Sequence, residues 1–522
     1  MRWLVVPILT TLILLAPVGR AVWARAAAPR PVILIHGFAS SPAAWSAYTR
    51  AEGYLASIGR RGFAVGDGQA PGLLRMGDPL DPGQPTSTVL ENASALRDYI
   101  AGVRRLTGAD QVDLLAHSMG GLVARAYIDR FMPRGEVAQL IMLGTPNAGT
   151  GCAQLPSAAG LYLPAALELR PSYVESVFNA QIRAQHGVPF FLVAGIGVGA
   201  PLGSPCAEAP SDLIVARVSV AAISGQVTEV TALHTDLIVS DDVFQKVVRA
   251  LLLAQTPATL TEQLPAAEPV EPLDFTRVFP GRVAPGEQHQ ELVQIDEVAV
   301  ASFALFDPTR SLTLEVRGVS GAVLLLSADA NALRQVDDPA SLVRIGYGVD
   351  HPRPGPWRIT VSATPRTPPD GAPYALSARV RGGAHLRATT SASVVTIGNS
   401  VKLAANLQLG NESLNLSGAT VWLRGDKNTS DMLPVSVQHD SIESEWRPEA
   451  AGVYGLDLLV EGVLPDGTPL ERSAFLSVEA VQADVAPLRA VTAGLYVVSL
   501  ALASWAGLVG WRSWRRKASA TQ

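Results

Sequence analysis

The sequence predicts an α/β fold with a doubly wound parallel sheet, followed by two all-β sandwich modules and a C-terminal transmembrane helix. In residues 30–255, apolar β-branched runs alternate with helical patterns, which is typical of βαβ units. From residue 273 the apolar period changes to two, which is typical of half-buried strands. Residues 490–511 contain no charged side chain, and as a helix they would span about 33 Å, enough for a hydrocarbon core of roughly 30 Å.

Composition places the chain among ordinary globular proteins of several domains. It has 522 residues, of which 48% are hydrophobic, and a formal net charge of −5. Only the last few residues form a basic cluster, so the sequence predicts no nucleic-acid partner.

Both ends of the chain carry membrane-directed patterns. Residues 1–24 have a positive start, an apolar core over residues 4–18 and small residues before a cleavage point, as in a secretory signal peptide. An uncleaved N-terminal anchor is the alternative. The basic tail 512–522 follows the apolar segment 490–511 and should stay in the cytoplasm. The sequence thus predicts a single-pass protein of the cell membrane, with its body outside the cytoplasm.

The first predicted strand, residues 31–35, is a continuous apolar run, as in a parallel strand buried on both faces. His36, Gly37 and Phe38 follow directly. A glycine at a strand end lets the backbone turn and leaves nearby N–H groups free. The Phe38 N–H is therefore a candidate donor to an oxyanion, and a plain strand-to-loop turn is the alternative.

Residues 112–121 read as a strand, a sharp turn at Ser118 and a helix. Strand and helix nearly touch in such a turn, so the residues two before and two after the serine must be small. Ala116 and Gly120 meet this requirement. The pattern predicts that Ser118 is a nucleophile and that the Met119 N–H is a second oxyanion donor. A surface serine in a glycine-rich turn is the alternative.

The remaining elements of this half complete an alternating pattern. Helical spacing is found in residues 42–60 and 91–106, and apolar strands are predicted at 137–143 and 188–194. Residues 150–185 could form a helical cap with an apolar inner face. Ligands of such sheets bind at the carboxyl ends of the strands, where the candidate residues lie.

A serine nucleophile needs a base, and the base needs a group that holds its tautomer. Of the eight histidines, four lie beyond the predicted sheet and two lie inside its turn motifs. His186 and His234 remain, and the chain order serine, acid, histidine selects His234. Asp212 lies 22 residues before His234 and is the predicted acid. Glu208 is the alternative acid, and Asp212 could also be a turn-forming loop carboxylate.

The chain contains two cysteines, Cys152 and Cys206. Outside the cytoplasm a disulfide between them is plausible, and two buried free thiols are the alternative. Two cysteines alone do not predict a metal site.

Five motifs together carry a resemblance to a known superfamily. They are Ile-His-Gly-Phe, Ala-His-Ser-Met-Gly-Gly, Leu-Gly-Thr-Pro-Asn-Ala-Gly, Ser-Asp-Leu-Ile-Val and Leu-His-Thr-Asp-Leu. In this order they resemble the α/β-hydrolase superfamily over residues 30–255, and within it the secreted triacylglycerol lipases and the related glycolipid inositol deacylases. The resemblance implies a nucleophile, an acid, a base and two oxyanion donors, which here are Ser118, Asp212, His234, Phe38 and Met119.

The resemblance also raises two points of detail. In many of those lipases glycine follows the acid, whereas Leu213 stands there in this chain. Some relatives hold a calcium ion near the base, and Asp236, Asp241 and Asp242 are the carboxylates that could do so here. A solvated helix start is the preferred interpretation of these carboxylates, so no cofactor or metal is predicted.

The C-terminal half reads as a linker, 256–272, and two β modules, 273–384 and 386–480. The first resembles the β-sandwiches appended to secreted proteases, and the second an immunoglobulin-like sandwich. Neither contains a candidate catalytic cluster. We expect both to be spacers or adhesion modules that lift the N-terminal half off the membrane.

Together these patterns predict a membrane-tethered extracytoplasmic serine hydrolase that cleaves carboxylic esters, in particular lipid esters, through an acyl-enzyme. An acyltransferase with the same three residues is one alternative. A catalytically inert binding or adhesion protein of the same fold is another.

Overall fold

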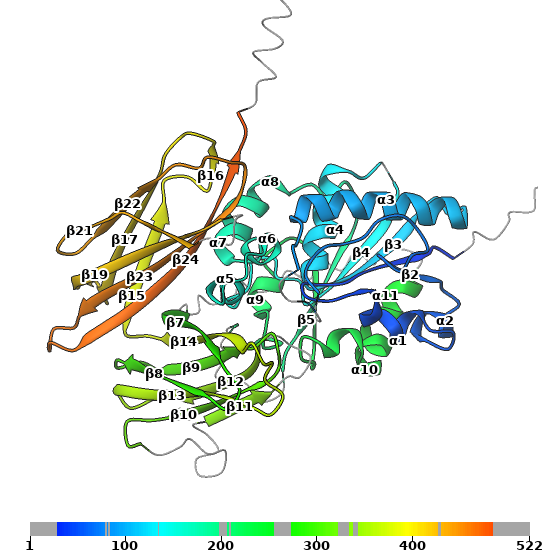
Figure 1. Cartoon of the computed structure of the whole chain (residues 1–522). Helices are drawn as coiled ribbons and strands as arrows, with labels where there is room; N and C mark the ends of the chain where they lie inside the picture. The colour runs from blue at the N-terminus through cyan, green and yellow to red at the C-terminus, as the bar shows by residue number, and fades with distance from the viewer. Residues whose placement is uncertain are drawn as a thin grey trace, which may run out of the picture.

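The computed structural model describes residues 29–483, apart from 79–80, 82–83, 134, 198–205, 208–209, 255–272, 322–332, 338–342 and 426–429 (Figure 1). The predicted signal peptide, linker, transmembrane helix and basic tail therefore lie outside the described residues. Within the described residues, every helix is too short or too polar to cross a bilayer.

The N-terminal half, residues 29–254, is built on a parallel sheet of six strands, as the sequence predicted. The strand order is β2-β1-β3-β4-β5-β6, so the strand that precedes Ser118 lies in the centre. The edge strands β2 and β6 were not predicted, because they are short or half-exposed and lack an apolar run. The strands are β1 (Val32–Ile35), β2 (Gly62–Ala64), β3 (Val112–His117), β4 (Val137–Leu143), β5 (Phe190–Gly195) and β6 (Gln226–Val230).

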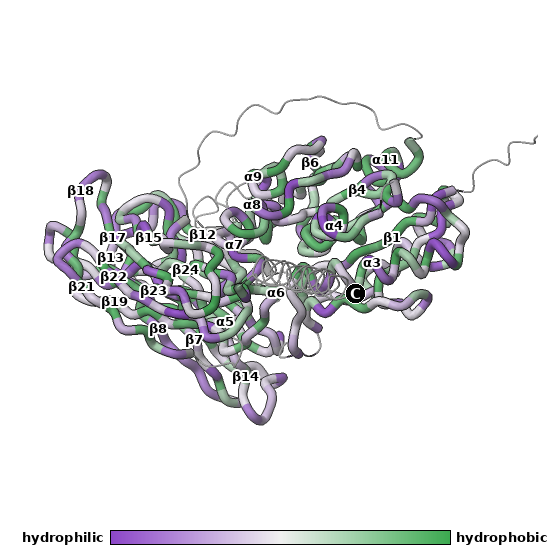
Figure 2. The backbone as a smooth tube through the Cα atoms, turned by 90° about the horizontal axis from the view of Figure 1, so that it is seen from above, coloured by the Kyte–Doolittle hydropathy of each residue, from purple (hydrophilic) through white to green (hydrophobic). Residues whose placement is uncertain are grey.

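Helices cover both faces of this sheet and form two apolar cores. On one face lie α3 (Val89–Thr107) and α4 (Met119–Arg130), and α3 begins with a capping box between Thr88 and Glu91. On the other face lie the short helices α10 (Asp241–Val243) and α11 (Arg249–Leu253), together with the segment 42–60. Figure 2 shows hydrophobic colouring along the central segment at β1.

The segment 42–60, which has helical spacing, forms three short helical pieces. A 3-10 turn at Pro42–Trp45 leads into α1 (Ser46–Thr49), and α2 (Tyr54–Ser57) follows a break. The chain turns at Gly53, where a Cβ atom would lie 2.6 Å from the Ala47 carbonyl oxygen. Packing of the aromatic rings in this segment against Phe244 of the opposite helix outweighs the helical spacing.

Residues 150–182, here called the cap, form a series of short helices. They are α5 (Leu155–Ala158), α6 (Pro164–Leu167), α7 (Pro171–Tyr173), a π-helical turn (Val174–Phe178) and α8 (Asn179–Gln181). Figures 1 and 2 both place α5–α7 between the six-stranded sheet and the C-terminal strands. The cap is thus enclosed between two folded bodies.

The C-terminal half, residues 273–483 and here called the β half, consists of two sandwiches with separate apolar cores. One sheet of ten strands runs through both sandwiches, because Ser473 of the last strand pairs with Phe275 of the first. The first sandwich contains β7 (Leu273–Val283), β8 (Gln288–Ile295), β9 (Val300–Phe306), β10 (Leu312–Arg317), β11 (Leu333–Asp337), β12 (Val343–Asp350), β13 (Gly355–Ala363) and β14 (Ala372–Arg381). The second contains β15 (Ala384–Thr390), β16 (Val394–Thr396), β17 (Val401–Leu409), β18 (Glu412–Ser413), β19 (Asn415–Arg424), β20 (Ser430–Leu433), β21 (Val435–Val437), β22 (Ile442–Trp446), β23 (Gly452–Val463) and β24 (Pro469–Val481).

A buried ion pair fixes the junction of the two sandwiches. Both carboxylate oxygens of Asp296 lie 2.7 Å from the Arg472 guanidinium, and the Ala384 N–H donates to the same carboxylate. The pair is buried, so separating the sandwiches would leave unpaired charges in an apolar environment. The two modules are therefore joined by both a shared sheet and a buried ion pair.

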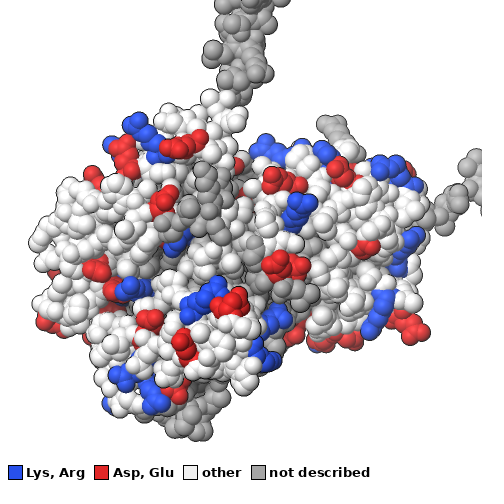
Figure 3. Space-filling model, viewed as in Figure 1, with Lys and Arg blue, Asp and Glu red and all other residues white. Residues whose placement is uncertain are grey.

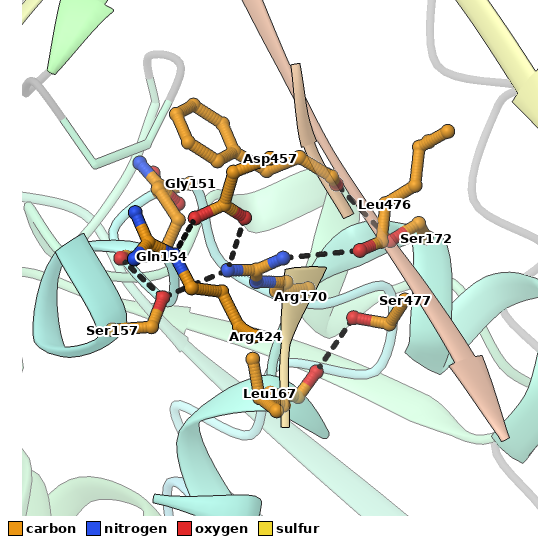
Figure 4. Close-up of polar contacts among 11 residues, drawn as sticks. Gly151, Gln154, Ser157, Leu167, Arg170, Ser172, Arg424, Asp457, Leu476 and Ser477 are labelled. Carbon is orange, nitrogen blue, oxygen red and sulfur yellow. Dashed lines mark hydrogen bonds and ion pairs between the residues drawn. The ribbon is translucent and has the colours of Figure 1, made fainter. Parts of the chain in front are cut away.

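The β half packs directly on the cap, which differs from the expected spacer arrangement. The Arg170 guanidinium of the cap lies 2.8 Å from the Asp457 carboxylate of β23, and it donates to the Leu476 carbonyl oxygen of β24 (Figure 4). Arg424 of β19 pairs with the same aspartate at 2.8 Å. On the face shown in Figure 3, by contrast, acidic and basic side chains are interspersed over the surface. The cap–β half contact is thus a buried polar interface.

Replacement of Arg170 by Met tests the energetic weight of this interface. The variant leaves the Asp457 carboxylate buried with one cation fewer, and we expect it to lower the free energy of unfolding by about 3 kcal/mol. Urea unfolding followed by tryptophan fluorescence measures this change. Arg97→Met is the control, because its pair with Asp98 has side chains 45% and 55% exposed, and such pairs contribute about 0–1 kcal/mol. Equal midpoints for the two variants would contradict the expectation.

Candidate active site

Ser118 occupies a strained turn between β3 and α4. Its φ is 53° and its ψ is −130°, a conformation that is uncommon for a residue with a side chain. The turn is held because the Ser118 N–H donates to the Leu143 carbonyl oxygen at 2.9 Å. A Cβ atom on Gly37 would lie 2.7 Å from the serine Cβ, and one on Gly120 would lie 2.5 Å from the His36 carbonyl oxygen. The small residues of the motif are therefore required by close backbone contact.

The predicted oxyanion donors lie on either side of this turn. Met119 is the first residue of α4, and the first N–H groups of a helix have no intrahelical partner. Phe38 follows Gly37, the residue in close contact with Ser118, and lines the same cavity as the serine. The loop after Phe38 is fixed because the Ala39 N–H donates to the Met76 carbonyl oxygen at 2.8 Å.

Asp212 and His234 are joined by a buried hydrogen bond. The His234 Nδ1 lies 2.7 Å from the Asp212 Oδ2, and both side chains are buried. The other carboxylate oxygen accepts from the backbone N–H groups of Ile214 and Val215, at 3.0 and 2.7 Å. The His234 N–H donates to the Asp212 carbonyl oxygen at 3.0 Å. Both carboxylate oxygens thus have hydrogen-bond partners, and the bond to Nδ1 fixes the orientation of the imidazole ring.

Leu213 adopts a left-handed conformation with φ of 78°. This turn allows the two following N–H groups to reach the Asp212 carboxylate. A left-handed residue with a side chain costs about 1–2 kcal/mol, a cost that glycine avoids. The departure from glycine at this position is therefore a matter of local strain and leaves the position of the acid intact.

Two glycines lie against Asp212 and His234, a position that the sequence analysis did not predict for them. A Cβ atom on Gly144 would lie 2.9 Å from the Asp212 Oδ2 and 3.1 Å from the His234 Nδ1. One on Gly195 would lie 2.8 Å from the Asp212 Cβ. Each glycine directly follows a predicted strand, at the edge of the sheet where the candidate site residues lie, and this position was the available signal for its place in the site.

Ser118 and His234 line one cavity of about 480 Å³. No hydrogen bond joins the Ser118 hydroxyl and the His234 ring, both of which belong to the described part of the chain. Such bonds are often long before substrate binds. Three parts of the chain supply the walls: the strand ends of the sheet, the cap with Pro156 and Leu169, and the β half with Phe306 and Val343.

Comparisons with known proteins show what this chain is similar to. A protein-family model described as palmitoyl protein thioesterase matches residues 31–186. The propeptide form of the lipase BlEst2 from Bacillus licheniformis covers 87% of this chain and 95% of its own, at 15% identity and a TM-score of 0.54. The N-terminal half has an α/β-hydrolase fold. The mature form of that lipase covers 43% of this chain and 92% of its own, at 18% identity and a TM-score of 0.35. A thermophilic esterase from Thermogutta terrifontis covers 43% of this chain and 90% of its own, at 17% identity and a TM-score of 0.28.

Other histidines of the α/β-hydrolase half have separate roles. His117 packs on the His234 ring, and its Nε2 lies 2.9 Å from the His234 carbonyl oxygen. Burial lowers the pKa of His117 to about 3 and the pKa of His36 to about 4, so both rings stay neutral. His186 is an exposed loop residue whose Nε2 lies 3.3 Å from the Asp129 carbonyl oxygen.

The alternative residues for acid and metal are placed as follows. Glu208 lies outside the described residues. Asp241 and Asp242 begin α10, where Ser240 accepts from the Val243 N–H, and Asp242 pairs with Lys246. Within the described ranges, no three His, Cys, Asp or Glu side chains come together in a way that would hold a metal ion.

Cys152 and Cys206 form a disulfide that connects the cap to the segment before Asp212. Cys152 also lines the cavity. The bond therefore holds one wall of the cavity close to the loop that carries the acid.

Replacement of both cysteines by Ala opens a loop with a sequence separation of 54 residues. In the chain-entropy treatment of disulfides this loss amounts to about 4 kcal/mol. We expect a lower urea midpoint for the double variant, matched by wild-type protein treated with a thiol reductant. Identical midpoints for oxidised and reduced wild-type protein would contradict this expectation.

The buried His117 predicts a loss of stability in acid. Its ring takes up a proton in the unfolded chain below about pH 6.5 but stays neutral in the folded protein down to about pH 3. The unfolded state then binds more protons, so stability falls as the pH decreases through this interval. We expect His117→Gln to flatten the dependence of the thermal midpoint on pH between about 7 and 4.5. His186→Gln, at an exposed position, should keep the wild-type slope.

Proposed function

We propose that Ser118, His234 and Asp212 form a catalytic triad that hydrolyses carboxylic esters through an acyl-enzyme. The observation that carries this proposal is the buried Asp212–His234 hydrogen bond of 2.7 Å beside the cavity that Ser118 also lines. The strained turn presents the serine at the end of its strand, as nucleophilic catalysis on this fold requires.

The reaction would proceed in two steps. The Ser118 oxygen attacks the ester carbonyl while the His234 Nε2 takes its proton, and the same proton then goes to the leaving alcohol. Water repeats the sequence on the acyl-enzyme and releases the acid. Asp212 holds the imidazolium through Nδ1, and the N–H groups of Phe38 and Met119 stabilise the oxyanion.

The cavity and the comparisons support an acyl substrate. Apolar side chains dominate the walls, which suits a hydrocarbon chain, and the volume lies within the ordinary range for ligand cavities. The lipase and esterase neighbours and the thioesterase family match support a hydrolase of ester bonds. We place lipid esters first. The family match over residues 31–186 makes a fatty thioester the second candidate.

We also propose that the enzyme acts outside the cytoplasm and is tethered by its C-terminal segment 490–511. The Cys152–Cys206 disulfide supports this location, because disulfides persist in oxidising compartments. The signal-like pattern of residues 1–24 agrees with export.

Ser118→Ala should reduce hydrolysis of nitrophenyl esters to the uncatalysed level, because no other oxygen can form the acyl-enzyme. Asp212→Asn should lower kcat by about 10⁴-fold, since the imidazole is then held in the wrong tautomer. Ser224→Ala, which removes an exposed hydroxyl, is the control and should retain full activity.

A fluorophosphonate probe separates the competing interpretations. Wild-type protein should be labelled and Ser118→Ala should not, whereas an inert binding protein would not react at all. Fatty thioesters assayed beside oxygen esters rank the two substrate classes. Product analysis with a competing alcohol distinguishes hydrolysis from acyl transfer.

A further inference from the structure

We propose that the β half supplies a wall of the acyl-binding cavity and thereby sets the acyl-chain length that the enzyme prefers. This inference rests on the proposed ester hydrolysis at Ser118. It assigns Phe306 and Val343 as specificity-determining residues, although they lie far along the chain from the candidate catalytic residues.

Phe306 and Val343 reach the cavity from neighbouring strands. Phe306 ends β9, Val343 begins β12, and the two residues are direct cross-strand partners. Side chains of such partners lie side by side on one face of a sheet. Both line the cavity that Ser118 and His234 line. One end of the first sandwich therefore faces the candidate catalytic serine.

This wall belongs to a packed core. Phe306 is 2% exposed, and it clusters with Cys152 and Leu155 of the cap, Cys206 and Ala375 of β14. The cluster thus joins side chains of the α/β-hydrolase half and of the β half. Close-packed cores resist changes of volume, so the cavity boundary is defined at this point.

Contacts of the second sandwich hold the part of the cap that also lines the cavity. Leu169 lines the cavity, and its neighbour Arg170 is fully buried between the cap and the strands β23 and β24 (Figure 4). The Ser477 hydroxyl donates to the Leu167 carbonyl oxygen at 3.2 Å, and the Tyr162 hydroxyl donates to the Val453 carbonyl oxygen at 3.2 Å. The β half therefore positions the cap as well as closing the cavity beside it.

An acyl chain that extends from Ser118 into this cavity would meet the Phe306 ring. Removal of the ring lengthens the space available to the chain. Discrimination of about 10-fold or more is expected for groups that differ by a methylene or more in an apolar pocket. Phe306→Ala should therefore favour longer acyl chains, with little change for acetate esters, which do not reach the wall.

The test compares Phe306→Ala and Phe303→Ala in the full-length protein, with nitrophenyl esters from acetate to palmitate. Both changes remove a buried phenyl ring from β9, but Phe303 packs on Trp357 inside the sandwich core. We expect the ratio of kcat/KM for palmitate over octanoate to rise about tenfold or more in Phe306→Ala. In Phe303→Ala the ratio should stay at the wild-type value.

A second pair of variants keeps the test independent of folding defects. Val343→Phe narrows the cavity and should lower the ratio of kcat/KM for palmitate over octanoate esters. Val349→Phe is the control on the same strand, because Val349 faces the sandwich core. Fluorophosphonate labelling gives the amount of competent protein for each variant, and the rates for every ester, acetate included, are divided by this amount.

The outcomes separate the two proposals. Loss of labelling and of all ester hydrolysis in wild-type protein would overturn the proposed function. Normal labelling with an unchanged palmitate-to-octanoate ratio of kcat/KM in Phe306→Ala and Val343→Phe would overturn only the proposal that the β half forms a wall of the cavity. A uniform rise of kcat/KM in Phe306→Ala for every ester, acetate included, would also overturn the proposed wall. The β half would then obstruct access to Ser118 instead of contacting the acyl chain.

Discussion

The hydrogen bond between Asp212 and His234 is the contact on which the rest of the site depends. Its carboxylate is buried, so both oxygens need partners, and the backbone N–H groups of Ile214 and Val215 provide them for one oxygen. That requirement imposes the left-handed turn at Leu213. The close approach of strand ends requires Gly144 beside the pair. The strained backbone at Leu213 and the glycine at position 144 thus both accompany the buried Asp212–His234 pair.

Much of the N-terminal half could be predicted because its information is local. Parallel strands buried on both faces give apolar runs, and candidate site residues follow the ends of these runs. Chain order then selected His234 over His186, which the structure places on an exposed loop. The edge strand β6 escaped prediction because it is half-exposed and alternates weakly. The helical spacing of residues 42–60 did not show where the helix breaks, whereas the structure ends α1 at Thr49 and begins α2 at Tyr54.

The role of the β half could not be read from the sequence for a different reason. Phe306 has the pattern of an ordinary core residue of a β strand, and Arg170 that of an ordinary charged residue in the predicted helical cap. Their contacts join residues separated by hundreds of positions, such as Arg170 with Asp457. Hydrophobic periodicity predicts which face of a strand or helix is buried, but it does not predict which part of the chain packs on that face. The expectation of spacer modules followed from considering each module in isolation.

If Ser118 is the nucleophile proposed above, the position of the cap between the six-stranded sheet and the β half bears on how a substrate would reach it. The two sandwiches are locked by the buried Arg472–Asp296 pair, and the cap is tied to them by Arg170 and to the acid-bearing segment by the disulfide. A cap held at both ends cannot swing away without breaking buried ion pairs, which costs several kcal/mol for each pair. In the hydrolase proposed above, selectivity would then come from the shape of a preformed cavity. The side chains that define its far wall, from a strand pair in the β half, would then matter as much for substrate choice as those of the α/β-hydrolase half.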